Sequence, residues 1–375
     1  MLQNREIERT IGRLLESHGI GLFRALPVED MPEFRTRVMK RARTYNKESE
    51  ARQWLERITR PQALHPWVRS VLLFGCNTND QFAQPDHAPE TPYGRVGRWL
   101  IYLSTLQAVA QDVISVLEAA GYRGLSLGDH HYPLRPAAVR AGFARFRRNN
   151  FVFHEKLGSW VGWWQVLTDA EFDYGPLVDE IWAEDICGTC PGYCIESCGS
   201  RALFAPYTFD SERCVRVWNL APVEIVPVAV REGFSNWILG CDACQEACPF
   251  NQKAQVSSRP DFARTPASSD GVLMLLGQRN YVQLIPILER KPGADEDTQR
   301  VDMLRRNAAI VLGATRDARG IPALVSALHD QSVTVRAHAA RALGRLGEKV
   351  AVKEALAVEQ NPAVRQEIKG AVGDE

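Results

Sequence analysis

Two short stretches rich in cysteine, CGTCPGYCIESCG at 187–199 and CDACQEACPFN at 241–251, decide how this sequence is interpreted. They contain seven of the nine cysteines, and an eighth, Cys214, lies between them. In a reducing compartment clustered cysteines are more often metal ligands than disulfides, because their thiols remain available as thiolates. The two stretches therefore predict a metal-binding module.

The number and order of these cysteines favour iron–sulfur clusters over zinc. Eight thiolates with no obvious histidine partner suit two 4Fe-4S clusters, and Pro249 directly follows Cys248, as in the ferredoxin signature. In two-cluster ferredoxins three closely spaced cysteines hold one cluster, while the fourth holds the other. We therefore predict two sets of ligands: Cys187, Cys190, Cys194 and Cys248 for the first cluster, and Cys198, Cys214, Cys241 and Cys244 for the second. Zinc sites are the alternative.

Two details of the cysteine pattern depart from the usual ferredoxin spacing. Three residues, rather than two, separate Cys190 from Cys194, and two of them, Pro191 and Gly192, can turn the chain tightly enough to absorb the insertion. The second departure is Gly199, which follows Cys198 where the ferredoxin signature has proline. The ninth cysteine, Cys76, lies apart in the apolar run SVLLFGCN. Free cysteines in such runs are usually buried, so we expect Cys76 to be structural.

The rest of the chain predicts an α+β fold with further domains on either side of the cysteines. With 375 residues and equal numbers of basic and acidic side chains, 45 of each, the chain can bury a core in two or three domains. Helical spacing at 1–60, an apolar strand at 71–74, a long helix at 98–120 and a linker at 251–270 are expected. We predict an α/β domain at 1–178, a ferredoxin-like domain with two 4Fe-4S clusters at 179–256 and an all-α domain at 271–375.

The C-terminal part repeats itself. LRRNAAIVLG, from Leu304, and VRAHAARALG, from Val335, share an arginine, two alanines, a leucine and a glycine at a spacing of 31, and a degenerate third copy begins at Val364. A period near this length, with small residues that let helices pack closely, is typical of HEAT-like repeats. Such a module either binds a partner or supports its neighbour, and the sequence leaves both open.

Charge and hydropathy restrict the location and the partners. No run reaches the roughly 18 apolar residues of a membrane helix, and the charged start lacks a secretory signal, so we expect a cytoplasmic protein without membrane contact. A net charge of zero does not by itself favour nucleic acid. Two basic stretches, Arg35–Lys47 and Arg135–Arg148, can meet phosphates or simply be solvated.

Residues 128–169, upstream of the cysteines, contain candidates for chemistry. Asp129 is a potential general acid if desolvation raises its pKa, although a turn or a helix cap explains it better from sequence alone. His130 and His131 follow it. The tryptophans at 160, 163 and 164 either form the base of a pocket for a planar ligand or fill the core, and the core is the simpler interpretation.

The order of the motifs resembles the epoxyqueuosine reductase family. The resemblance starts near residue 65 and runs through SVLLFGCN, an aspartate shortly before a proline, AVRAGF, RRNN, GSW, LTD, both cysteine stretches and the HEAT-like tail. Members of this family are cobalamin-dependent iron–sulfur enzymes related to reductive dehalogenases. They remove the epoxide oxygen of epoxyqueuosine in the anticodon loop of transfer RNA, which completes queuosine. The resemblance implies that the N-terminal α/β domain is corrinoid-binding-like.

The resemblance also implies roles for individual residues. Asp129 matches the aspartate proposed to donate a proton to the leaving oxygen. The family has Gly-Lys-Asn where this chain has Arg147-Arg148-Asn149, which puts a long cation at a position beside the corrinoid. The eight predicted cluster ligands match the family's cysteines, and the positions around the corrinoid are matched by Asn77, Arg140, Gly142, Asn149, Gly158, Ser159 and Trp160.

Three functions are compatible with these features. The first is an oxidoreductase that uses two 4Fe-4S clusters and cobalamin to reduce epoxyqueuosine to queuosine in transfer RNA, with the anticodon loop as partner and an external low-potential electron donor. The second is a paralogous corrinoid iron–sulfur reductase that acts on a small molecule. The third, a simple electron carrier, is the weakest, because a carrier does not need the long upstream domain or the repeats.

Overall fold

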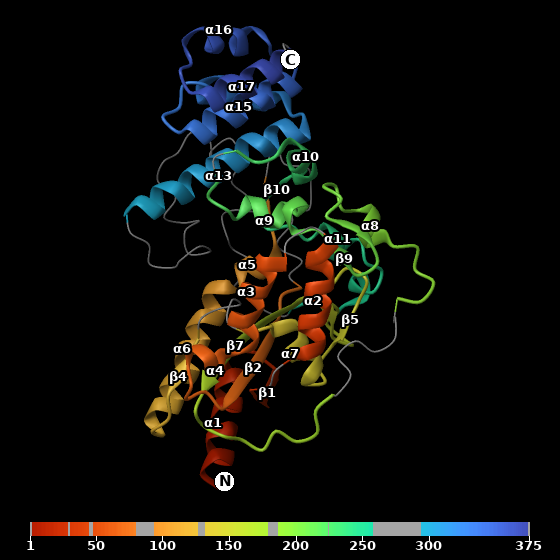
Figure 1. Cartoon of the computed structure of the whole chain (residues 1–375), viewed down its shortest axis with the longest axis vertical. Coiled ribbons are helices and arrows are strands. Elements are labelled where there is room, and N and C mark those ends of the chain that lie inside the picture. The colour runs from red at the N-terminus through yellow and green to blue at the C-terminus, as the bar shows by residue number, and fades with distance from the viewer. Residues whose placement is uncertain are drawn as a thin grey trace.

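The computed structural model describes residues 2–28, 31–44, 48–79, 94–126, 132–178, 187–223, 225–257 and 294–373. Its three regions follow one another along the long axis of the molecule (Figure 1). The sheet and its helices lie at one end, the C-terminal helices lie at the other, and the short elements of the cysteine region lie between them (Figure 1). None of the helices in these ranges is long and apolar enough to cross a membrane.

A four-stranded sheet forms the centre of the N-terminal region. The strand order is β1-β2-β7-β4, with β1 at Leu22–Pro27, β2 at Ser70–Asn77, β7 at Val161–Thr168 and β4 at Gly124–Leu125. All three neighbouring pairs are antiparallel. β7 is buried along its whole length and β2 at all but its last residue, which explains their mainly apolar sequences. The strand predicted at 71–74 is confirmed, whereas β1 was not predicted.

Helices cover both faces of this sheet. The helices of the region are α1 (Leu2–Ser17), α2 (Pro32–Thr44), α3 (Glu48–Thr59), α4 (Pro61–Leu64), α5 (Arg98–Ile101), α6 (Leu103–Ala119) and α7 (Leu134–Arg140). α1 and α6 share one core with Phe74 and Trp164, and α7 shares the other with Leu73 and Trp163. Neighbouring strand residues thus enter opposite cores, as the two-residue period of a strand requires. The interpretation of the tryptophans as core residues is confirmed for Trp163 and Trp164, whereas Trp160 is buried but belongs to neither of these cores.

The single helix predicted at 98–120 is divided at Tyr102, so this prediction was wrong in one respect. The N–H of Tyr102 bonds to the carbonyl of Trp99 at 3.2 Å, which is a tighter turn than an α-helix makes. The Tyr102 side chain is buried in the core that α6 shares with the sheet. α6 ends as predicted, because Gly121 adopts a φ of +86° beyond its last turn.

The cysteine region consists of short helices and strands: α8 (Tyr193–Glu196), β8 (Leu203–Ala205), β9 (Thr208–Phe209), α9 (Val215–Asn219), α10 (Val228–Arg231), β10 (Trp237–Leu239) and α11 (Ala243–Glu246), with 3-10 turns η3 (Ser211–Arg213), η4 (Glu232–Phe234) and η5 (Asn251–Lys253). β10 pairs in parallel with β3 (Arg95–Val96), which joins this region to the N-terminal one. Upstream, β5 (Arg145–Phe146) and β6 (Val152–Phe153) form a hairpin.

The linker predicted at 251–270 starts too early. Asn251 is only 4% exposed, and its side-chain amide donates to the Ser159 hydroxyl at 2.7 Å. The polar composition that suggested a linker therefore includes a residue that holds the cysteine region against the sheet. Residues 258–270 lie outside the described residues.

The C-terminal region is a stack of helices, as the repeat predicted. It comprises α13 (Ala294–Thr315), η9 (Ala318–Gly320), α14 (Ile321–Ala327), α15 (Val333–Arg345), α16 (Val350–Val358) and α17 (Pro362–Val372). The repeated glycines permit close packing: a Cβ on Gly313 would lie 2.8 Å from Ala342 Cα, and one on Gly344 would lie 2.6 Å from the Ala371 carbonyl oxygen. The three aligned copies thus lie on α13, α15 and α17, which stack in that order.

The repeats and the cysteine region share one hydrophobic core, and a buried arginine connects them further. Arg306 of α13 is fully buried and donates to the carbonyls of Trp218, Ala221 and Val223 at 2.9, 3.1 and 2.6 Å. Burial, with a smaller effect from the charge of Arg231, lowers the pKa of Arg306 to about 10. The guanidinium is thus still a cation at neutral pH and satisfies three carbonyls of the neighbouring region.

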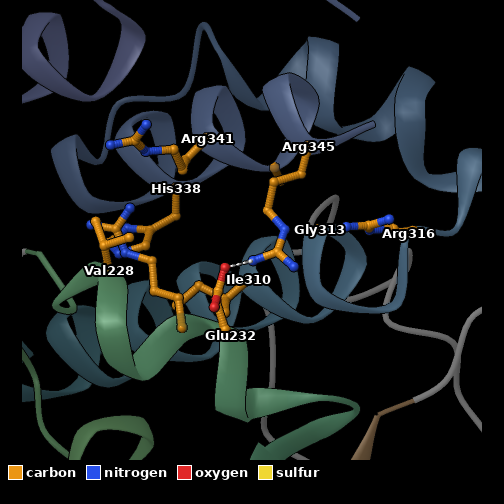
Figure 2. Close-up of a pocket in the computed structure, with 10 residues that line it drawn as sticks. Val228, Glu232, Ile310, Gly313, Arg316, His338, Arg341 and Arg345 are labelled. Atoms are coloured by element: carbon orange, nitrogen blue, oxygen red, sulfur yellow. Dashed lines mark ion pairs between the residues drawn. The ribbon is translucent and has the colours of Figure 1, made fainter. Parts of the chain in front are cut away.

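Charged side chains from both regions line a pocket of about 260 Å³ at this junction (Figure 2). Arg231 donates two hydrogen bonds to the Glu367 carboxylate, at 2.6 and 2.7 Å, and both side chains are buried. Arg345 forms a longer ion pair with Glu232, 3.6 Å, which is dashed in Figure 2. Because an unpaired buried charge is costly, the pairing of Arg231 with Glu367 helps to fix the orientation of the repeats.

The buried His338 of α15 predicts that acid weakens this junction. Its Nδ1 lies 2.7 Å from the Thr334 carbonyl, and its Nε2 accepts from the N–H of Val226 at 3.2 Å, which describes a neutral ring. Burial, followed by the charge of Arg231, holds the pKa of His338 well below 6.5. The stabilisation is therefore present above the unfolded pKa of about 6.5 and is lost as the pH falls below it.

We expect the free energy of unfolding, measured by urea denaturation and circular dichroism, to decrease between pH 7 and pH 5. The contribution of this group to the slope is at most about 1.4 kcal/mol per pH unit. His338→Gln should be less stable at pH 7 and should lose most of the slope. Burial also lowers the pKa of His154, which accounts for a residual slope. An undiminished slope in His338→Gln would exclude His338 as its source.

Candidate iron–sulfur and substrate site

The two cysteine loops lie side by side although they are distant in sequence. α8 packs against α11, and the Ser197 hydroxyl donates to the Ala243 carbonyl at 3.2 Å. The first loop accommodates its extra residue at Gly192, which has a φ of +102° and directly precedes α8. This is the conformation that glycine adopts without strain, as expected for a wider loop.

The first group of thiols surrounds one small pocket. Its lining includes Cys187, Cys190, Cys194 and Cys248. Burial first, and then the charges of the other three thiols, raise the pKa of Cys194 to about 11. Thiols that oppose one another's ionisation can all be thiolates only beside a strong positive charge, such as that of bound metal.

The second group comprises Cys198, Cys214, Cys241 and Cys244. Burial raises the pKa of Cys244 well above its usual value, and the thiols of Cys241, Cys214 and Cys198 raise it further. Burial also raises the pKa of Cys241; an N–H from Ala243 opposes this effect, while Asp242, Cys214 and Cys198 add to it. All nine cysteines are free thiols.

These observations test whether the residues suit the predicted clusters. Within the described ranges no three His, Cys, Asp or Glu side chains are arranged around a single metal ion. Instead, the eight thiols fall into two groups of four whose members interact electrostatically, and these are the two sets expected from the spacing. Soft thiolates in sets of four are the donors that 4Fe-4S clusters use. The residues therefore fit such clusters, and the role of each cysteine stays a prediction.

The turn between β5 and β6 reaches both cysteine loops. Arg148 donates to the carbonyls of Gly188 and Cys190, both at 2.9 Å, and Asn149 donates to the carbonyl of Cys244 at 3.2 Å. Arg147 is buried and lines the pocket of the first thiol group. This end of the basic stretch 135–148 therefore contacts the cysteine loops and is not an open surface for phosphates.

Five of the seven residues matched to the corrinoid pocket lie beside the second cysteine loop and the segment that follows it. The Asn77 side chain donates to the Gln255 carbonyl at 3.0 Å, and the Ser159 hydroxyl donates to Gln245 Oε1 at 2.8 Å. Gly158 has a φ of +59°, and a Cβ there would lie 2.2 Å from Asn251 Oδ1. The other members are Asn149, described above, and Trp160, which is buried beneath the guanidinium of Arg98 at 4.0 Å.

The other two matched residues contact a different segment. Arg140 donates to the Val178 carbonyl at 2.8 Å, and a Cβ on Gly142 would lie 3.8 Å from the Val178 side chain. Asp129, His130 and His131 lie outside the described residues. The residues on either side of that segment are placed: Ser126 donates to the Gln165 carbonyl of β7 at 2.9 Å, and Tyr132 is buried.

Sequence reasoning missed a network of charges that joins the second cysteine loop to the segment of β3 and α5. The N–H of Arg98 donates to Asp242 at 2.7 Å, and both Arg98 and Arg95 form ion pairs with Glu246. Burial raises the pKa of Asp242, an effect that the N–H and charge of Arg98 oppose. The acidic residues within CDACQEAC were the available signal, but their partners lie about 150 residues upstream in GRVGRW.

Comparisons with known proteins agree with this architecture. A family model described as a 4Fe-4S double cluster binding domain matches residues 186–251, and one described as HEAT repeats matches 292–372. The chain is similar to epoxyqueuosine reductase of Xanthomonas campestris, with 28% identity over 299 residues that cover 77% of this chain and 81% of that protein. It is also similar to that of Aliivibrio fischeri, with 27% identity over 72% of both proteins.

Solved structures of epoxyqueuosine reductases share the fold along nearly the whole chain. A crystal structure of a selenomethionine-labelled epoxyqueuosine reductase matches with a TM-score of 0.80 and 20% identity, covering 98% of this chain and 99% of the other. A second, of epoxyqueuosine reductase with a tRNA-Tyr epoxyqueuosine-modified stem loop, matches with a TM-score of 0.78 and covers 98% of both chains. The chain is thus similar in sequence to epoxyqueuosine reductases over most of its length, contains a match to the double-cluster domain, and shares the fold of solved epoxyqueuosine reductases.

Proposed function

We propose that this protein reduces epoxyqueuosine to queuosine in transfer RNA. The observation that carries the proposal is that two groups of four thiols adjoin the α/β region. The fold in which they do so is shared, over 98% of this chain, by an epoxyqueuosine reductase that was crystallised with an epoxyqueuosine-modified stem loop. The reaction consumes two electrons and two protons, converts the epoxide to a carbon–carbon double bond and releases the oxygen as water. The electrons come from an external low-potential donor, and the substrate places the reaction in the cytoplasm.

The cysteine loops are the proposed ligands for two 4Fe-4S clusters. Cys187, Cys190, Cys194 and Cys248 would hold the first cluster, and Cys198, Cys214, Cys241 and Cys244 would hold the second. Bound there, such clusters supply single electrons at low potential. The surrounding protein keeps the loops in place: Arg148 holds the first loop through two carbonyls, and Asn149 holds the second through one.

Cobalamin is the proposed third cofactor. Its support is the family resemblance together with the position of Asn77, Asn149, Gly158, Ser159 and Trp160 beside the second cysteine loop and the segment that follows it. When bound, cobalamin would supply a cobalt centre able to react with the substrate carbon. The corrinoid-binding character of the N-terminal region is part of this proposal.

Asp129 is the proposed proton donor to the oxygen that leaves the ring. Cleavage of a carbon–oxygen bond develops negative charge on the oxygen, and a carboxylic acid within hydrogen-bond reach stabilises that charge by transferring its proton. The assignment rests on the match between Asp129 and the family's aspartate.

Omission of single components tests the proposed function and its cofactors. Anaerobically reconstituted protein, a one-electron donor and cobalamin should convert epoxyqueuosine in transfer RNA to queuosine, detected by mass spectrometry of the nucleosides. Omitting the donor or the cobalamin should abolish the conversion. Conversion at the full rate by protein shown to contain no cobalamin would reject cobalamin while leaving the activity in place.

A further inference from the structure

Arg147 occupies an unusual position for an arginine next to predicted cluster ligands. Its side chain lines the same pocket as the four thiols of the first group, and the residue is only 9% exposed. Its Nη1 lies 4.0 Å from the Sγ of Cys187. The centre of the guanidinium lies 3.6 Å from the ring centroid of Phe250 and 4.8 Å from that of Phe153. Two aromatic rings therefore contact the guanidinium, which is itself largely buried.

The charge of Arg147 acts on the thiols electrostatically. Its Nη1 is within 4.0 Å of one proposed ligand, the Sγ of Cys187, and its side chain lines the pocket that the other three ligands of the first group also line. Arginine stays protonated at all accessible pH values. A charge that is buried with its partner is also screened by salt much less than an exposed one. The thiols of the first group therefore experience a permanent positive charge.

We propose that Arg147 raises the reduction potential of the first 4Fe-4S cluster. This inference rests on the proposed ligand set Cys187, Cys190, Cys194 and Cys248. Each electron that enters a cluster adds one negative charge, so a fixed cation beside the ligands stabilises the reduced form more than the oxidised form. Net charge, hydrogen bonds to sulfur and exposure to solvent are the factors by which proteins adjust such potentials, and Arg147 changes all three.

The effect should be confined to the first cluster. The groups that act on Cys241 and Cys244 are the thiols of their own set, an N–H from Ala243 and the acidic Asp242, while the contact of Asn149 with the second loop is that of a neutral amide. The cation that acts on Cys214 of this set is Arg216, which a change at residue 147 leaves in place. Arg147 thus acts on the reduction potential of the first cluster and does not contact the substrate.

Redox titration of Arg147→Gln tests the proposal. The protein is reconstituted anaerobically, and the reduced clusters are followed by electron paramagnetic resonance as the potential is lowered with dithionite and mediators. The midpoint potential of one cluster should become more negative than in the wild type by more than the scatter of repeated titrations. Arg147→Lys, which retains a cation, should show a smaller shift. The matched control is Arg145→Gln, which removes the same charge from an exposed position and should leave both midpoints unchanged.

Two outcomes overturn the proposal, and they differ. Iron and sulfide for two clusters in Arg147→Gln, with both midpoints equal to those of the wild type, would show that Arg147 has no such role. Wild-type protein without iron after reconstitution would instead reject the ligand sets themselves. If Arg147→Gln does not retain its first cluster, Arg147→Met, which has a shorter, unbranched and uncharged side chain, is titrated in its place and must show the same negative shift.

Discussion

A Cys244→Ser variant should retain about half of the wild-type iron and lose all measurable reduction of epoxyqueuosine. Two 4Fe-4S clusters correspond to about eight iron atoms per chain, and loss of one leaves about four. Cys244 is partly buried and interacts with the other three thiols of its group, so a serine hydroxyl, which is a hard and weakly acidic ligand, would replace a soft thiolate in that group. Iron and acid-labile sulfide analysis, with nucleoside mass spectrometry, provides both readouts.

Cys76→Ser is the matched control for this experiment. Cys76 is 5% exposed in β2, belongs to the core beneath α1 and α6, and was correctly predicted to be buried. The same change of sulfur to oxygen should therefore leave iron content and turnover unchanged and reduce only the stability, by about 1–3 kcal/mol. Equal iron in Cys244→Ser and the wild type, or stoichiometric zinc in place of iron, would refute the assignment of this thiol group.

Asp129→Asn should keep both clusters and any bound cobalamin, and should decrease turnover by about two to four powers of ten. Such a loss is the usual contribution of a general acid that protonates a leaving group. Asparagine has nearly the same size and can still form hydrogen bonds, so the local structure should be preserved. The rate of queuosine formation is measured under single-turnover conditions, and visible spectra report the cofactors.

An exposed carboxylate provides the control for Asp129. Asp173→Asn removes an acidic side chain whose only ion pair in the described part of the chain is with the exposed Arg5, and it should react at the wild-type rate. Turnover in Asp129→Asn equal to that of the wild type would show that another group donates the proton. His130 or His131, which follow Asp129 in the sequence, would then be the next residues to replace.

Local patterns in the sequence predicted the features that depend on local spacing. The thiol sets follow from the order of the cysteines. The helical stack follows from the repeated small residues, of which the glycines let α13, α15 and α17 approach closely. The strand at 71–74 follows from a run that is buried on both faces. In each case the residues that form the pattern are themselves the residues that bind, pack or become buried.

Features that depend on distant partners were not predictable in this way. β1 lies within the segment 1–60, for which helices were expected, and its Arg24 guanidinium donates to the distant carbonyls of Ala141 and Tyr174, both at 2.8 Å. Asn251 resembled the start of a linker, although its partner is Ser159. The resemblance placed Arg147 beside the corrinoid, which stays a prediction; that the β5–β6 turn also carries it to the first group of thiols could not be inferred from the sequence. The boundaries of the three domains stay predictions.

The most direct test of the central claim is the fate of epoxyqueuosine in a transfer RNA stem loop. The substrate is incubated anaerobically with reconstituted protein, cobalamin and a one-electron donor, and the nucleosides are then separated and weighed by mass spectrometry. We predict that epoxyqueuosine loses one oxygen atom and becomes queuosine. Unchanged epoxyqueuosine, from protein that holds about eight iron atoms and shows the spectrum of bound cobalamin, would contradict the proposed substrate and favour reduction of a small molecule instead.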